Sequence, residues 1–221
     1  MIKIYNGPRF THQSFFEELI NYLAQHEDVT LRKIKKDFPK IDTIDRQLES
    51  FIKAGYIIRE DRRYRNGFDL STDAVREDLR LNDTIFVDSE SSIYPYLEEP
   101  HFKMEVVNST NEAVLVERVA FTLNDLSFSS YFEKIKRRED LSPNQEKLYA
   151  ILGDVNQDYA LKHITTFLLK FTLQDQVLQR RPDIFVQALE MLGYIRKNIE
   201  DKYELKMSLD NDGPYFRVKE F

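Results

Sequence analysis

VTLRKIKKDFPKIDTIDRQLESFIKAGYIIREDRRYRNGF, residues 29–68 of this 221-residue chain, predicts two short helices followed by a small β-hairpin. Thr30 is a good N-cap for the first of these helices. Pro39 is expected to end it, because proline disfavours helical geometry in the residue before it. Gly55 suits the position just past the end of the second helix. The polar residues 60–62 then supply the turn of the hairpin.

A helix over residues 14–25 is expected to precede this stretch. Ser14 and Glu17 have the spacing of a capping box, and Asp42 is the expected cap of the third helix. Each helix is too short to be stable alone in water, so the three are expected to share one core. The expected core residues are Phe16, Leu19, Leu23, Leu31, Ile34, Leu48, Phe51, Ile52 and Ile57.

This segment resembles a winged helix-turn-helix domain. The resemblance is carried by Val29-Thr30-Leu31, the Phe38-Pro39 break, the stripe Leu48, Phe51 and Ile52, and Ala54-Gly55-Tyr56-Ile57 running into an arginine-rich hairpin. The whole chain also resembles an uncharacterised family of cytosolic proteins from Gram-positive bacteria, which implies no known activity.

The resemblance implies a third helix that enters the DNA major groove and a wing that touches the backbone. Asp42, Asp45 and Glu49 lie on the exposed side of that helix and would repel phosphates. Contact with the DNA backbone through the second helix and the wing is therefore the expected mode. The expected contact residues are Arg32, Lys33, Lys35, Lys36, Arg62, Arg63 and Arg65, with Arg46 and Lys53 as candidates on the third helix.

A second interpretation remains open, because winged helices also serve as protein-interaction modules and fold does not fix function. A basic run on a short helix is often only a solvated face. Tyr94-Pro95-Tyr96-Leu97, expected in an exposed loop, is the candidate seat of such an interaction. The expected partners are thus double-stranded DNA, or a protein partner or second copy of the chain.

The composition of the chain limits which functions are possible. The formal net charge of −6 means that a basic footprint can only be local. The absence of cysteine excludes disulfides and thiolate chemistry. The N-terminus lacks the pattern of a secretion signal, and the most apolar helix-like run, residues 164–171, is too short to span a bilayer. A cytoplasmic protein without membrane contact is expected.

The chain as a whole predicts an α+β fold with two domains, residues 1–85 and 86–221. A short helix capped by Ser71 or Thr72 would contain Val75 and Leu79. A central hairpin of residues 101–107 and 113–121 precedes a helical half that begins after Ser127.

The helical half is expected to end in another hairpin. Residues 203–209 alternate between apolar and polar, 210–213 turn the chain, and 215–219 return. Residues 51–57 and 189–195 also share a helix, a glycine stop and Tyr-Ile. The echo indicates a second winged-helix-like unit, or only a common preference at helix ends.

Catalytic patterns are absent from the sequence. Neither a glycine-rich phosphate loop, a GxSxG elbow nor an HExxH helix occurs, and the four histidines fall in different predicted elements. Glu117 lacks the lysine two residues later that a metal-dependent nuclease would need. No catalytic residue, metal or cofactor is predicted, although carboxylate pairs stay open because their distances are unknown.

Overall fold

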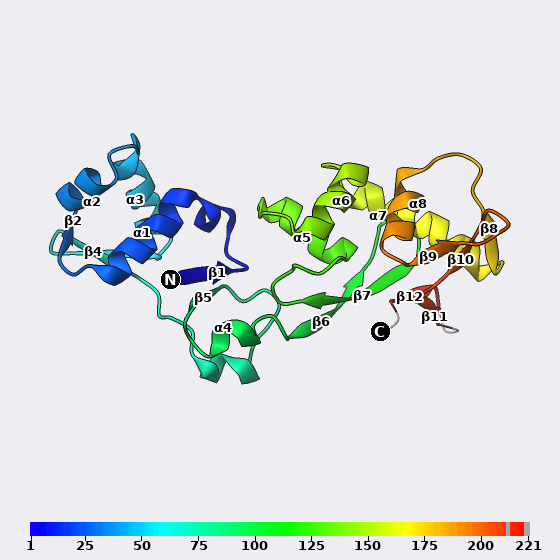
Figure 1. Cartoon of the computed structure of the whole chain (residues 1–221), viewed down its shortest axis with the longest axis horizontal. Helices are drawn as coiled ribbons and strands as arrows, with labels where there is room; N and C mark the ends of the chain where they lie inside the picture. Colours follow the sequence, from blue (N-terminus) through cyan, green and yellow to red (C-terminus); the bar gives the residue numbers. More distant parts are fainter. Residues whose placement is uncertain (211–212, 219–221) are drawn as a thin grey trace. The chain divides into compact units, whose positions relative to one another are not determined.

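The computed structural model describes residues 1–210 and 213–218 and has an α+β fold (Figure 1). The chain divides into two compact units, Met1–Glu98 and Glu99–Phe221. Two hydrophobic clusters of buried residues form, one inside each unit. Strand β5 (Ile85–Asp88) belongs to the first unit, where it pairs with the N-terminal strand β1 (Ile2–Tyr5).

Three helices surround the core of the first unit: α1 (Ser14–Gln25), α2 (Leu31–Asp37) and α3 (Ile44–Lys53). Phe16 and Phe51 are buried at its centre, with their ring centroids 4.9 Å apart in an edge-to-face arrangement. The expected core is confirmed, except that Leu31 and Ile52 are only partly buried.

The first unit also contains a three-stranded sheet. Its strands are β2 (Val29–Thr30), which comes after α1 in the chain, and β3 (Ile57–Glu60) and β4 (Arg63–Asn66), which come after α3. Their order in the sheet is β2-β4-β3. All pairs are antiparallel, and β4 lies in the middle. The expected hairpin is therefore present, and β2 adds a third strand that the sequence did not predict, because two residues carry no periodic pattern.

Helix ends separate correct from wrong predictions. Thr30 caps α2, accepting a hydrogen bond from the backbone N–H of Lys33 at 3.3 Å. The capping box at Ser14 is wrong, because Gln13 is the N-cap of α1 and no side chain caps it. Asp42 does not cap α3 either, since the N-cap is Thr43. Ser14 and Asp42 thus each lie one position away from the actual N-cap of their helix.

The remainder of the first unit consists of short elements. They are the β1–β5 pair, 3₁₀ turns at Arg9–His12 and Asp73–Glu77, and the single helical turn α4 (Ile93–Tyr96). The expected helix reaching Leu79 is wrong, because only the 3₁₀ turn forms. Across the described part of the chain, every helix is too short or too polar to cross a bilayer.

The second unit contains a four-stranded sheet in the order β11-β12-β7-β6. The central hairpin is confirmed as β6 (His101–Val106) with β7 (Val114–Ala120). Strand β12 (Tyr215–Arg217) lies parallel to β7 and antiparallel to β11 (Ser208–Leu209). The expected C-terminal hairpin is thus short and joins the central sheet; Asn211, Asp212 and Lys219, which the prediction included, lie outside the described residues.

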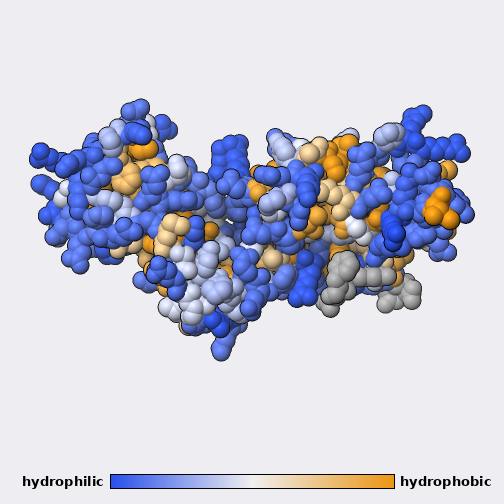
Figure 2. All heavy atoms as spheres, in the orientation of Figure 1, coloured by the Kyte–Doolittle hydropathy of each residue, from blue (hydrophilic) through white to orange (hydrophobic). Residues whose placement is uncertain are grey.

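Helices of the second unit are α5 (Phe128–Arg137), α6 (Pro143–Leu152), α7 (Gln157–Leu168) and α8 (Ile184–Met191), with a 3₁₀ turn at Leu169–Thr172. Ser142 and Gln145 form the capping box of α6, with proline at its first position. In the face drawn in Figure 2, apolar residues gather over the α6–α8 region, whereas hydrophilic residues cover most of the α2–α3 region of the first unit.

A second three-stranded sheet in this unit repeats the first. Strands β8 (Gln176–Leu178), β10 (Lys202–Leu205) and β9 (Ile195–Lys197) follow the order β8-β10-β9, which corresponds to β2-β4-β3. The helix ends also match: Tyr56 N–H donates to the Phe51 carbonyl and Tyr194 N–H to the Leu189 carbonyl, both at 3.0 Å. Residues 179–183, between β8 and α8, contain no counterpart of α2. The sequence echo is therefore structural, but partial.

Candidate functional site

Four arginines surround one hollow in the first unit. Its volume is about 500 Å³, and we call it the arginine hollow. It is lined by Thr30, Leu31, Arg32, Arg59, Arg62, Arg63 and Tyr64. The lining comes from β2, from the start of α2, from β3 and β4, and from the turn between these two strands. A single surface therefore gathers the cations of the helix and of the hairpin.

The register of the sheet explains why these residues meet. Thr30 pairs with Arg63, and Val29 pairs with Tyr64, which places the first turn of α2 beside β4. On the other side of β4, Arg59 pairs with Tyr64. Residues more than thirty positions apart are therefore brought together by the two residues of β2.

Arg62 lies in the two-residue turn of the hairpin. Glu60 and Arg63 are paired, so only Asp61 and Arg62 connect the strands, with φ of 45° and 63°. Positive φ at both positions is typical of a type I′ turn, which matches the twist of a hairpin and usually contains glycine or asparagine. An arginine in this conformation is unusual, and its side chain lines the hollow.

The chain's own carboxylates neutralise only part of this surface. Arg59 lies 2.6 Å from Glu49 and Arg63 lies 3.3 Å from Asp28, and all four side chains are at least 46% exposed. Exposed ion pairs contribute little to stability and exchange readily for another anion. Within the described residues, neither Arg32 nor Arg62 has an ion pair or side-chain hydrogen bond. Two cations of the hollow are thus free for a ligand.

The other expected contact residues lie outside the hollow. Lys35 pairs with Asp45 at 2.6 Å and Arg65 with Glu60 at 3.2 Å. Lys33 stands 5.9 Å from the ring centre of Tyr22. The remaining three expected residues are exposed and do not line the hollow: Lys36, Arg46 and Lys53.

Sequence reasoning missed Arg59 and Tyr64 as parts of the site. Both belong to the arginine-rich hairpin, but only the pairing of β4 with β2 and the shared lining of the hollow show that they face the start of α2. The expected acidic side of α3 is confirmed in part: Asp45 and Glu49 are exposed, and each pairs with a cation.

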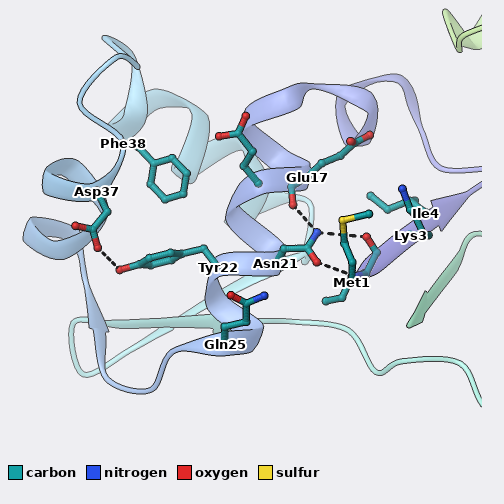
Figure 3. A pocket seen from close by; sticks show the side chains of 11 residues that line it. Met1, Lys3, Ile4, Glu17, Asn21, Tyr22, Gln25, Asp37 and Phe38 are labelled. Carbon is teal, nitrogen blue, oxygen red and sulfur yellow. Dashed lines mark hydrogen bonds between the residues drawn. The ribbon is translucent and has the colours of Figure 1, made fainter. Parts of the chain in front are cut away.

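A second hollow of about 590 Å³ runs along α1, between β1 and the end of α2 (Figure 3). Its charged lining is mostly acidic, with Glu17, Glu18 and Asp37 against Lys3. The Asn21 amide bridges to β1, accepting from Ile2 N–H at 2.7 Å and donating to the Ile2 carbonyl at 3.3 Å. This groove does not suit a polyanion.

One edge of the acidic groove is ordered by a tyrosine. Tyr22 donates a hydrogen bond to Asp37, as Figure 3 shows. Burial and this hydrogen bond raise the pKa of Tyr22 to about 12, so it remains a neutral donor.

The expected exposed loop at residues 94–97 is wrong. These residues belong to the helical turn α4 and its end, and Leu97 is fully buried. Tyr94 packs against Tyr5, with ring centroids 6.3 Å apart, while Arg76 lies over the ring of Tyr96 at 4.6 Å. Aromatic residues that suggested an interaction patch instead hold α4 to the rest of its unit.

In the second unit, Glu117 is buried and fully hydrogen-bonded. It accepts from the backbone N–H groups of Phe128 and Ser129, at 2.9 and 2.8 Å, and from the Tyr194 hydroxyl. Burial raises the pKa of Glu117, while hydrogen bonds from Ser129, Tyr194 and the backbone act in the opposite direction. This carboxylate ties the start of α5 to β7, and its hydrogen bonds are made to groups of the chain itself.

Histidines and acids do not converge elsewhere in the described residues. His12, His26 and His101 each contact a backbone carbonyl, and His163 stacks on Phe185. Within residues 1–210 and 213–218, no cluster of histidine and carboxylate side chains could hold a metal ion.

Comparison with known proteins finds a family match on the first unit. Residues 2–100 match a family described as a domain of unknown function (DUF1803). No curated protein and no solved structure matches the chain. Every residue that lines the arginine hollow falls inside the matched segment, so the candidate site lies in the part of the chain that is similar to this family.

Proposed function

We propose that the first unit is a winged-helix module that binds nucleic acid through α2 and the β3–β4 wing. The observation that carries this proposal is the arginine hollow, where Arg32, Arg59, Arg62 and Arg63 line one surface. Arginine forms directed, paired hydrogen bonds to phosphate oxygens. Since Arg32 and Arg62 are not engaged by carboxylates of the described chain, phosphate can bind without first displacing an internal partner.

The β9–β10 hairpin of the second unit, which we call the second wing, supplies an internal comparison. On the β9–β10 hairpin, Lys197 pairs with Asp201 at 2.9 Å and Lys202 with Glu200 at 2.7 Å. Lys197 and Lys202 are therefore each paired with a carboxylate of their own hairpin. The proposal assigns nucleic-acid contact to the first wing only.

A gel-shift titration against mixed-sequence DNA, single- and double-stranded, at low and moderate salt tests the proposal. The double variant Arg32→Gln/Arg62→Gly should bind at least about tenfold more weakly, with a salt slope reduced by roughly one for each phosphate that the variant no longer binds. The matched control Lys197→Ala/Lys202→Ala also removes two positive charges, but from the second wing, and should bind like the wild type. Absence of binding at low salt, or equal weakening in both variants, would contradict the proposal.

The acidic groove of Figure 3 favours a second candidate function, contact with a protein. Met1 is 58% exposed at its edge, and Tyr22 and Phe38 line it beside Glu17 and Glu18. This candidate predicts a dimer or partner complex that Phe38→Ser disrupts and that the arginine variants leave intact. Light scattering of the wild type, of Phe38→Ser and of Arg32→Gln/Arg62→Gly distinguishes the two functions.

A further inference from the structure

We infer that the arginine hollow receives an unpaired nucleotide, so that the protein prefers single-stranded nucleic acid, including a single-stranded overhang, over a fully paired duplex. This inference rests on the proposed function and specifies its ligand. It follows from the apolar floor of the hollow, from the arginines on its rim, and from the acids of the neighbouring helix.

The floor of the hollow is apolar. Leu31 and Tyr64 line the hollow together with the arginines, and Tyr64 is only 6% exposed. Arginine side chains add apolar methylene stems to such a surface. A backbone phosphate of an intact duplex would reach the rim cations but leave this floor uncovered. A base that has left its stack has an apolar face that can cover it.

The rim combines two kinds of arginine. Arg59 and Arg63 are held at its edges by Glu49 and Asp28, with contacts of 2.6 and 3.3 Å. Guanidinium groups held in this way offer flat faces on which a base can stack. Arg32 and Arg62 keep their hydrogen-bond donors free for the phosphate of the same nucleotide.

Acidic residues next to the hollow disfavour a duplex. Glu49 of α3 contacts Arg59 of the rim, and Asp45 lies one helical turn earlier on the same helix. A duplex seated against α3 would bring its closely spaced phosphates near both carboxylates. A single strand can enter the hollow from the wing side without a second phosphate row meeting α3.

Fluorescence anisotropy of the full chain tests the inference with four labelled probes: oligothymidylate, an abasic strand of the same length, a blunt duplex, and that duplex with a single-stranded overhang. Oligothymidylate and the overhang should bind on the order of tenfold tighter than the abasic strand and the blunt duplex, because base stacking on a protein contributes about that factor. Arg62→Gly should weaken binding of all four probes, and Lys197→Ala of none.

The outcomes separate the inference from the function beneath it. If the abasic strand or the blunt duplex binds as tightly as oligothymidylate, only phosphates are recognised: the inference fails and the proposed function stands. If no probe binds at low salt, both fail. A competition experiment adds a check that needs no variant. Thymidine monophosphate should displace oligothymidylate at concentrations where inorganic phosphate does not. Equal displacement by the two competitors would also overturn the inference.

Discussion

Arg62 connects conformation to function at the scale of one residue. It occupies a turn position with φ of 63°, where glycine is free of the strain that a side chain brings. A chain that needs only the turn is served better by glycine or asparagine. The proposed role in binding phosphate gives a reason for arginine at this position.

The first prediction concerns Arg62→Gly. Relief of the positive-φ strain offsets the greater freedom of glycine in the unfolded chain, so the free energy of unfolding should change by less than about 1 kcal/mol. Binding of nucleic acid should fall although the fold is intact. Chemical denaturation and anisotropy on the same samples measure both effects. A drop of several kcal/mol in stability would show that Arg62 supports the fold and would remove it as evidence for a site.

Glu117 gives a second prediction, on pH. Its raised pKa means that the folded chain holds the carboxyl proton more tightly than the unfolded chain, for which the ordinary value is 4.5. Its contribution to stability is therefore complete below that value and is lost as pH rises through the folded pKa. Urea unfolding of the second unit should show stability falling as the pH rises above 4.5.

Glu117→Gln should remove that part of the pH dependence. It should also cost about 1–3 kcal/mol, because an amide cannot accept from all the buried donors that face it. Tyr194→Phe, which removes one donor and keeps the carboxylate, is the matched control and should retain a pH dependence. Identical pH profiles for Glu117→Gln and the wild type would refute the assignment of this dependence to Glu117.

At the scale of elements, the hairpin and α3 meet through a close backbone contact. Gly67 follows β4, and its N–H donates to the Tyr56 carbonyl at 2.9 Å. A Cβ atom placed on Gly67 would lie 2.3 Å from the carbonyl oxygen of Gly55. The absence of a side chain at this position therefore allows the hairpin to pack against the end of α3.

Gly67→Ala should accordingly destabilise the first unit by roughly 1–3 kcal/mol, the usual cost of forcing atoms into a packed site. Gly55→Ala is the comparison, because a Cβ there meets open space and only the positive φ of 83° opposes it, a cost of about 1 kcal/mol. Thermal unfolding of both variants tests the order. Equal stability of Gly67→Ala and the wild type would contradict the close contact.

Elements with a strong local signal could be predicted from the sequence. Thr30 and Gly55 are predicted correctly because each acts through backbone groups within four residues of itself. Long-range pairings could not be predicted: β1 pairs with β5, and β12 lies parallel to β7. Periodicity shows which face of a strand is buried, but it does not name the neighbouring strand.

The same limit applied to the candidate site. The basic character of α2 and of the hairpin is plain in the sequence, so Arg32, Arg62 and Arg63 were among the expected residues. Their convergence depends on the pairing of Thr30 with Arg63, which only the structure shows. The positive charge of Lys35 and Arg65 also makes them expected contact residues, but each forms an ion pair with a nearby acidic side chain.

At the scale of the molecule, the chain consists of two units that each bury a hydrophobic cluster of their own. We predict that residues 1–98 fold cooperatively as a fragment and bind nucleic acid with the affinity of the full chain, whereas residues 99–221 fold but do not bind. Calorimetry and anisotropy on the two fragments measure this. Binding by the second fragment would show that the arginine hollow is not the principal site.

The most direct test of the central claim is amide and arginine side-chain NMR of the ¹⁵N-labelled chain, titrated with short oligothymidylate. Signals of the residues that line the arginine hollow, above all Arg32, Arg62 and Tyr64, should shift together and saturate with one affinity. Signals of the β9–β10 hairpin and of the acidic groove along α1 should stay in place. An unchanged spectrum, or shifts centred on the acidic groove or the second unit, would contradict the account.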